Sequence, residues 1–180
     1  SAAFLVTVLG DEEYRVRELA QEALFEIGAP AIPALVEALK SRSHGIRDGA
    51  AASLERLEWK PTTPNETVYF LMAQESWIDL ARMGSDAITP LSSVLDNPDD
   101  NLRMGAVLAL GKMARPESIA LLARVLMDRN VMIRQKATMA LVDMGTAALQ
   151  PLSSVGSEAT PELQQAIQQV ITRIDRKVQT

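Results

Sequence analysis

The chain repeats one pattern of residues along its length. An apolar residue followed by arginine occurs at Val16-Arg17, Ile46-Arg47, Leu102-Arg103 and Ile133-Arg134, with spacings of 30, 56 and 31 residues. In each row an alanine follows the apolar residue by four positions, a leucine follows it by eight, and another leucine precedes it by seven. Self-similarity at a period of about 30 residues predicts units that bury their apolar faces only by stacking on their neighbours.

The spacing within each row indicates a helix. Positions 0, 4, 8 and 11 of a row share one face at 3.6 residues per turn, and the column at position 11 holds Ile27, Leu57, Met113 and Met144. Gly28, Gly84 and Gly145 then favour a left-handed residue that ends this helix. A second apolar helical run follows, as at Ile32, Leu35 and Leu39, and no segment has the alternation of a strand. The sequence therefore predicts an all-α fold, a right-handed α-solenoid of about five helical hairpins.

Prolines mark the second helix of each pair. We expect them in the first turn of these helices, where the missing N–H costs little. They are Pro30, Pro33, Pro90, Pro116 and Pro151.

One row is missing from the middle of the chain. Near its expected place Met72, Ser76, Leu80 and Met83 keep the spacing, but Ala73 stands where the arginine should be. We interpret this segment as a degenerate unit within a single repeat domain of residues 1–180. The expected divisions are a partial unit 1–10, then 11–42, 43–71, the degenerate 72–98, 99–129, 130–159, and a terminal helix 160–180.

The two ends of the chain differ. Ala2 to Leu9 has the register of a second helix with no first helix before it, which would expose an apolar face, so we expect a fragment of a longer protein. At the other end Thr160 is a good N-cap, with Pro161 at the first helical position.

The full pattern resembles the HEAT-like repeats of the phycobilisome-lyase type. It reads Val/Ile-Arg-x-x-Ala-x-x-Ala-Leu-x-x-Ile/Met-Gly, followed by Ala-Ile-x-x-Leu, and is found at 16–28 with 31–35, at 102–114 and at 133–145. Such repeats occur in bilin lyases, chaperones and adaptors. The resemblance implies that the second helices line a concave surface. Carried onto this register, the positions facing a ligand are Glu37, Lys40, Ser92, Ser93, Asp96, Arg124, Met127, Gln150, Ser153 and Ser154.

This predicted concave strip favours one function over two alternatives. It is small, mixed in polarity and weakly charged, which suits a protein or peptide partner better than a polyanion. The leading hypothesis is therefore a protein-binding scaffold or adaptor. A subunit of a bilin lyase or isomerase is the second hypothesis, and a nucleic-acid-binding protein is the third.

The charge distribution disfavours nucleic acid. The net charge is −5 and the pI about 5.0. Residues 102–145 carry seven basic and three acidic side chains, whereas 61–101 carry Arg82 alone against seven acids. This is an asymmetry along the stack rather than a basic groove.

Few residues suit catalysis or a cofactor. The chain has no cysteine, and its one histidine, His44, falls in an expected turn without a nucleophile or orienting acid at a recognisable spacing. The HEAT-repeat hydroxylases hold a di-iron centre with several His-Glu pairs, which this sequence lacks. We expect no catalytic residue, metal or cofactor. No apolar run reaches the roughly 20 residues of a membrane span, so we expect a soluble cytoplasmic protein without membrane contact.

Three further sets of residues have a structural and a functional interpretation. The arginine column (Arg17, Arg47, Arg103, Arg134) could bind anions, but we favour bonds to carbonyls and to Asp11, Asp99, Asp100 or Asp128 in the turns. The segment 59–77 holds four of the seven aromatic residues, Trp59, Tyr69, Phe70 and Trp77, for which we favour packing over a partner site. Met127, Met132, Met139 and Met144 lie at or beside core columns, so we expect them in the core.

Overall fold

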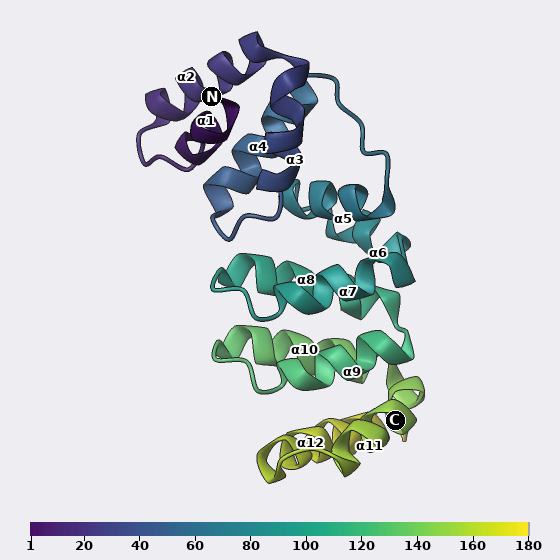
Figure 1. Ribbon diagram of the computed structural model, residues 1–180. Helices are drawn as coiled ribbons and strands as arrows, with labels where there is room; N and C mark the ends of the chain where they lie inside the picture. The colour runs from purple at the N-terminus through teal and green to yellow at the C-terminus, as the bar shows by residue number, and fades with distance from the viewer. Residues whose placement is uncertain (180) are drawn as a thin grey trace. The chain divides into compact units, whose positions relative to one another are not determined.

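A computed structural model describes residues 1–179, which form helices and turns and contain no strand (Figure 1). Thr180, the last residue of the expected terminal helix, lies outside the described residues. The α-helices are α1 (Ala2–Val8), α2 (Tyr14–Ile27), α3 (Ile32–Ala38), α4 (His44–Arg56), α5 (Pro64–Ala73), α6 (Trp77–Arg82), α7 (Ser85–Val94), α8 (Asp100–Met113), α9 (Pro116–Val125), α10 (Val131–Asp143), α11 (Leu149–Ser157) and α12 (Pro161–Val178). Two short 3-10 helices, η1 (Ala29–Ala31) and η2 (Gly145–Ala148), precede α3 and α11.

The chain divides into two compact units, Ser1–Ser76 and Trp77–Thr180. The boundary falls inside the region expected to be degenerate.

In the first unit, α2 packs against α4, α1 packs against α3, and α5 packs on α4. Its core is made of small and aliphatic side chains, among them Leu9, Leu24, Leu35, Leu39 and Leu54. This is the hairpin stacking that the repeat predicts.

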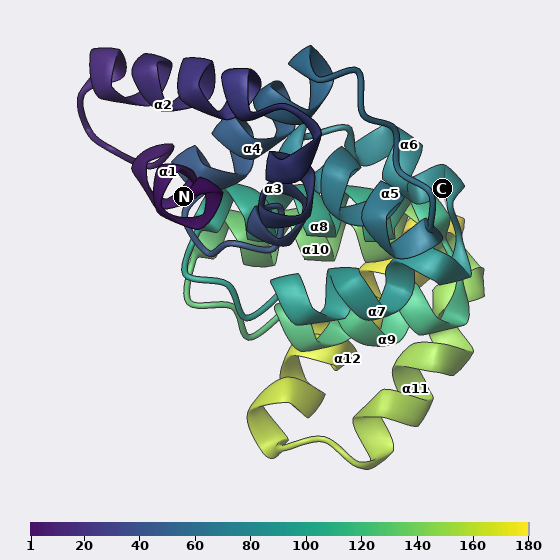
Figure 2. The ribbon, with the colours of Figure 1, turned by 45° about the horizontal axis from the view of Figure 1, so that its top comes forward.

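The second unit is an α-solenoid of two helical layers. The first helices α8, α10 and α12 form one layer, the second helices α7, α9 and α11 form the other, and α6 packs on α8 (Figures 1 and 2). Each helix packs on the next member of its own layer, and the two layers contact each other through the pairs α7–α8, α8–α9, α9–α10 and α11–α12. Leu91, Leu110, Leu122 and Leu141 are fully buried between the layers.

The repeated columns differ in burial. Every aligned alanine (Ala20, Ala50, Ala106, Ala137) and every aligned leucine (Leu24, Leu54, Leu110, Leu141) is buried. A small residue at the helix crossing lets the backbones approach, which explains the alanine column. The column at position 11 is less buried than predicted, and Ile27 is exposed, because it falls in the last turn of the helix.

The expectation that all four methionines lie in the core is wrong for three of them. Met127, Met132 and Met139 are exposed, and Met144 is half-buried. Met132 and Met139 lie on α10 beside the core columns of Ile133 and Leu141, which take the buried positions.

A left-handed residue ends the first helix of every repeat. The φ angles are 69° at Gly28, 56° at Glu58, 62° at Gly84, 49° at Ala114 and 61° at Gly145, all at the same position of the register. Two of the five are therefore side-chain-bearing residues in a conformation that favours glycine.

The degenerate unit does not contain one first helix through Met72, Ser76 and Leu80, as the spacing predicts. Met72 belongs to α5, which ends in a turn where Glu75 has φ 54°. There the N–H of Ser76 donates to Leu71 O at 2.9 Å and the N–H of Glu75 donates to Met72 O at 3.1 Å, the paired bonds that close a Schellman motif. The first helix of this unit is thus shortened to α6.

The prolines mostly begin helices. Pro116 and Pro161 occupy the first helical position, and Thr160 caps α12 as predicted, accepting the N–H of Leu163 at 3.4 Å. Pro90 is an exception because it lies inside α7, which starts directly after Gly84.

Candidate functional site

Each arginine of the repeated column binds the turn that precedes its own helix. Nη1 of Arg17 donates to the carbonyl oxygens of Asp11 and Glu12 at 2.8 and 2.9 Å. The other three make the same two bonds: Arg47 to Ser41 and Arg42 (2.9 and 3.0 Å), Arg103 to Asn97 and Pro98 (2.7 and 3.3 Å), and Arg134 to Asp128 and Arg129 (2.7 and 3.2 Å). A guanidinium nitrogen that is committed to two carbonyls does not present those donors to an anion. The geometry supports a structural role for this column.

The same turns are closed by a side-chain acceptor. Asp11, Ser41, Asn97 and Asp128 each accept the backbone N–H two residues further on, at 2.9, 3.2, 2.9 and 2.7 Å. Such local bonds favour turns over continued helix. The arginine and this acceptor together fix where each first helix begins.

Arg103 also reaches the turn that leads into the next repeat. Its side chain is only 2% exposed, and it pairs with Asp128 through Nε–Oδ2 (2.9 Å) and Nη2–Oδ1 (3.1 Å). Nη2 is also 2.7 Å from Oδ1 of Asp100, one turn earlier in α8. This two-point geometry directs the guanidinium and the carboxylate toward each other.

Other side chains connect the same two turns. Nδ2 of Asn130 donates to Oδ2 of Asp100 at 2.5 Å, and Nη2 of Arg129 donates to the carbonyl of Pro98 at 2.7 Å. The turns before α8 and before α10 are therefore joined by polar contacts from both repeats.

The network shifts the pKa values of its members. Burial raises the pKa of Asp128, but hydrogen bonds from Arg103 and from the N–H of Asn130 outweigh it and hold that pKa below its ordinary value. Hydrogen bonds from Asn130 and Arg103 lower the pKa of Asp100, and the bond to Asp128 raises the pKa of Arg103. All three side chains stay charged at neutral pH.

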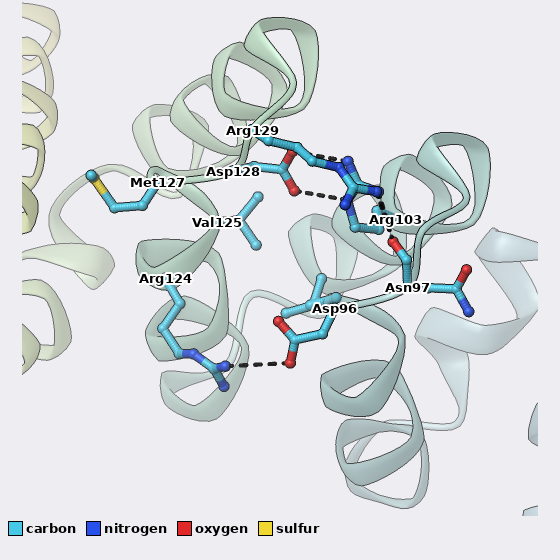
Figure 3. A pocket seen from close by; sticks show the side chains of 9 residues that line it. Asp96, Asn97, Arg103, Arg124, Val125, Met127, Asp128 and Arg129 are labelled. Atoms are coloured by element: carbon cyan, nitrogen blue, oxygen red, sulfur yellow. Dashed lines mark hydrogen bonds and ion pairs between the residues drawn. The ribbon is translucent and has the colours of Figure 1, made fainter. Parts of the chain in front are cut away.

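An open groove of about 270 Å³ lies over this network, between the C-terminal ends of α7 and α9 (Figure 3). Three residues of the predicted concave strip line it: Asp96, Arg124 and Met127. Nη2 of Arg124 lies 3.8 Å from Oδ2 of Asp96 across the groove, and both side chains are exposed. The remaining lining residues are Leu95, Asn97, Arg103, Val125, Asp128 and Arg129.

Sequence reasoning missed most of these lining residues. The predicted strip ends at Asp96 and Met127, whereas the groove continues along the turns to Asn97, Asp128 and Arg129. Asn97 and Asp128, which accept the turn hydrogen bonds, occupy the same position in their two rows. That shared position is the sequence signal from which the predicted strip could have been extended into the turns.

The other strip residues of the second unit are not brought into this groove. Ser92 and Ser93 lie on α7, and Gln150, Ser153 and Ser154 lie on α11; all are exposed except the half-buried Ser92. The Ser93 and Ser153 hydroxyls donate to the carbonyls of Pro90 and Leu149 on their own helices at 2.7 and 2.9 Å. These side chains are available as peripheral contacts.

Glu37 and Lys40 belong to the first unit. Nζ of Lys40 bonds Oε2 of Glu37 at 2.7 Å, which raises the pKa of Lys40, and it lies 5.9 Å from the ring centre of Tyr69. Both side chains are exposed.

The aromatic segment 59–77 packs within the fold. Trp59 and Phe70 meet edge to face with ring centres 5.5 Å apart, and both pack with Tyr69 against the core of the first unit. Trp77 lies against α8, where a Cβ on Gly105 would be 2.0 Å from its ring. Each of the four rings is half-buried.

No group of three or more side chains within residues 1–179 is placed to hold a metal ion. His44 is exposed and is the first residue of α4 rather than a turn residue. Over the same range, no single helix is long and apolar enough to cross a membrane. One helix pair bent by 116°, Tyr14–Ile27 with Ala29–Ala38, meets the length and composition criteria.

Similar solved structures include human deoxyhypusine hydroxylase in complex with glycerol (19% identity over 97% of this chain and 74% of that chain, TM-score 0.44). They also include a designed armadillo repeat protein (17% identity, 97% and 100% of the two chains, TM-score 0.39) and a computationally designed armadillo repeat protein for modular peptide recognition (16%, 96% and 99%, TM-score 0.34). No curated protein matches the sequence significantly.

The model of the HEAT repeat family matches residues 77–172, which include the groove and the buried network below it. With the matched region covering more than half of the sequence, the chain belongs to the HEAT repeat family.

Proposed function

We propose that this protein is a non-catalytic scaffold that binds a protein or peptide segment in the groove between the C-terminal ends of α7 and α9. The observation that carries the proposal is an exposed methionine, Met127, beside exposed charges and above a rigid polar floor. Methionine adapts its shape to varied apolar contacts and is frequent at peptide-binding surfaces.

The floor of the groove is internally satisfied. Arg103 already has carboxylate partners in Asp128 and Asp100 and carbonyl partners in the turn. It therefore needs no external anion, and its contacts hold the two turns in fixed positions. A preformed groove lowers the ordering cost of binding.

The ion pair at the rim of the groove, between Arg124 and Asp96, is easier to break than the contacts of the floor. Arg124 and Asp96 form a 3.8 Å ion pair between exposed side chains, a kind of pair that contributes at most about 1 kcal/mol. Each can exchange its partner for an opposite charge or a hydrogen-bonding group on a bound peptide at little cost. The rim thus offers one cation, one anion and one apolar side chain within a single groove.

This arrangement favours a peptide over the alternative ligands. The groove holds Arg103, Arg124 and Arg129 against Asp96 and Asp128, which is too small a charge excess for a polyanion. The resemblance to phycobilisome-lyase repeats rests on the repeated motif, and no side chain of the groove has a geometry that favours lyase chemistry. We therefore do not propose a lyase.

A random peptide library displayed on phage tests the proposal. The full chain would be used as bait, with R124E/M127E as the groove variant and R82E as the matched control, because Arg82 forms a comparable exposed pair with Asp79 at 2.7 Å. Enriched peptides should bind the wild type and R82E equally and should lose at least about tenfold in affinity for R124E/M127E.

Thermal unfolding of both variants ensures that the fold is retained. If library selection enriches no peptide, or if no enriched peptide binds R124E/M127E more weakly than the wild type, the groove is not the binding site.

A further inference from the structure

A second groove lies in the other helical layer of the same unit. It is formed by α8 and α10 and their C-terminal ends, has a volume of about 290 Å³, and is called the outer groove below. Leu108 and Met139 form its walls, Gly111 lies in its floor, and Lys112 and Lys136 line it. None of these residues lines the groove proposed above.

The floor is low because two small residues meet there. A Cβ on Gly111 would lie only 3.0 Å from Cβ of Ala140, so the two helices approach closely at this point. Without side chains to fill the space, a depression remains between Leu108 and Met139. Its volume is near the lower end of ligand pockets, about 300 Å³, which suits one large side chain with its backbone.

The walls are apolar at positions that face solvent. Leu108 is 37% exposed and Met139 is 58% exposed, and both stand six residues after the apolar anchor of their row. The same register position holds Glu22 in the first full row and Ala52 in the next. Two adjacent repeats thus each place a large apolar side chain on the surface at the same register position. These side chains do not contribute to the core, and together they form an exposed apolar patch.

The charges around the outer groove are predominantly positive. Among the described residues the one carboxylate that lines the groove is that of Asp143, which forms an ion pair with Nζ of Lys177 at 2.8 Å. Lys112 and Lys136 lie farther from Asp143 but close enough to help lower its pKa, so three lysines surround one carboxylate. The ends of α8 and α10 contribute about half a negative charge each, which offsets only part of the excess. In a chain of net charge −5 this local excess makes the outer groove complementary to an acidic ligand.

We propose that the outer groove binds an acidic peptide segment of another protein. One bulky apolar side chain of the segment lies over Gly111 between Leu108 and Met139, and flanking carboxylates pair with Lys112 and Lys136. The segment needs one apolar residue between acidic neighbours and does not need a fixed secondary structure. This interaction is independent of peptide binding at the α7–α9 groove.

Methionine-methyl NMR of the full chain provides a direct test. Met139 and Met144 report on the outer groove, and Met127 reports on the α7–α9 groove. The probes are capped peptides with leucine, methionine, phenylalanine or tryptophan between two pairs of glutamates. At least one of them should shift the Met139 and Met144 signals saturably at millimolar concentration, leave Met127 unchanged, and bind more weakly as salt is added.

Matched peptides and variants separate specific docking from general charge attraction. Replacing the central residue of the probe by serine, or its glutamates by lysines, should abolish the saturable shift. M139E and K112E/K136E should each weaken binding by at least about tenfold, whereas M132E, a control on the same helix at a residue 60% exposed, should stay within about twofold.

Three outcomes would overturn the proposal. The first is the absence of a saturable shift at Met139 with all four probes. The second is an equal shift with free glutamate, which indicates a simple anion site. The third is a Met139 signal that moves with protein concentration alone, which indicates that a second copy of the chain covers the outer groove.

Discussion

Arg103 and Asp128 form a two-point ion pair that joins α8 to the turn before α10, with Nε–Oδ2 at 2.9 Å and Nη2–Oδ1 at 3.1 Å. The two residues are 25 positions apart in sequence, and each also holds its own turn through backbone contacts. The pair therefore connects local turn geometry to the stacking of the repeats.

Removing Asp128 should destabilise the second unit strongly. Asp128→Ala leaves the buried guanidinium of Arg103 with only Asp100 as a carboxylate partner, and breaking such a pair costs about 3 kcal/mol. Urea unfolding should show a lower midpoint with an unchanged slope. Asp96→Ala removes an exposed partner and should change stability by less than about 0.5 kcal/mol. Equal effects of the two substitutions would show that the buried pair is energetically unimportant.

The stability due to Asp128 should depend on pH in one direction. Its pKa in the fold lies below the ordinary 3.8, so the ionised form is favoured by folding. That contribution is complete above the ordinary pKa and is lost as the pH falls below about 4 and through the lowered pKa of the folded state. The difference in unfolding free energy between the wild type and Asp128→Asn should be constant from pH 7 to about pH 5 and should shrink at lower pH. A difference that grows on acidification would contradict the assigned direction.

The left-handed column offers a stabilising substitution. Ala114 has φ 49° and ψ 43°, a conformation that costs an L-residue about 1–2 kcal/mol. Part of the gain from glycine is offset by the greater entropy of the unfolded chain, so Ala114→Gly should stabilise by about 0.5–1 kcal/mol. Gly28, with φ 69° and ψ −140°, should show the opposite sign when replaced by alanine. Thermal unfolding of both variants measures the two effects, and a loss of stability in Ala114→Gly would count against backbone strain at that position.

Gly105 should not tolerate a side chain. A Cβ there would be 2.0 Å from the ring of Trp77, so Gly105→Ala must displace the indole and should cost about 1–3 kcal/mol. Tryptophan emission in a Trp59→Phe background should shift to longer wavelength. The control is Gly156→Ala, where the nearest atom is 3.8 Å away and the better helix propensity of alanine should stabilise α11 by up to about 1 kcal/mol. Unchanged emission and stability in Gly105→Ala would rule out this close contact.

The fold could be predicted from the sequence because its local and global signals agree. The Ala20 and Leu24 columns recur at helical spacing in each of the four rows and are buried in all of them. The same buried positions recur in four rows, so the rows together predict the stacking of the helices although one row alone would be weak evidence for it.

The break at Gln74–Ser76 could not be predicted because its turn signal is weak. Glu75 takes the left-handed conformation without being glycine, and it does so because the turn completes a pair of backbone hydrogen bonds. Glu58 does the same at the end of α4. Propensity alone favours continued helix for glutamate, so the backbone hydrogen bonds of the turn, and not the residue type, mark both ends.

Only part of the candidate site could be predicted from the sequence. Register placed Asp96, Arg124 and Met127 on one surface, and the structure brings them together in one groove. The sequence could not decide which acidic residue reaches Arg103, because Asp99 and Asp100 are its neighbours in the chain and Asp128 stands in the next turn of the repeat pattern. In the structure Asp100 and Asp128 contact its guanidinium at 2.7 to 3.1 Å.

The two-point ion pair between Arg103 and Asp128 has a mechanical consequence. Apolar faces that slide past each other keep much of their contact area, whereas a bidentate pair loses its energy after a displacement of an ångström or so. Bending or twisting one hairpin against the next at this joint must first break the pair, so the joint resists small deformations and then yields abruptly. At the equivalent place of the first unit stands Ser41, whose hydroxyl cannot form a two-point ion pair with an arginine, so we expect that joint to be the more compliant of the two.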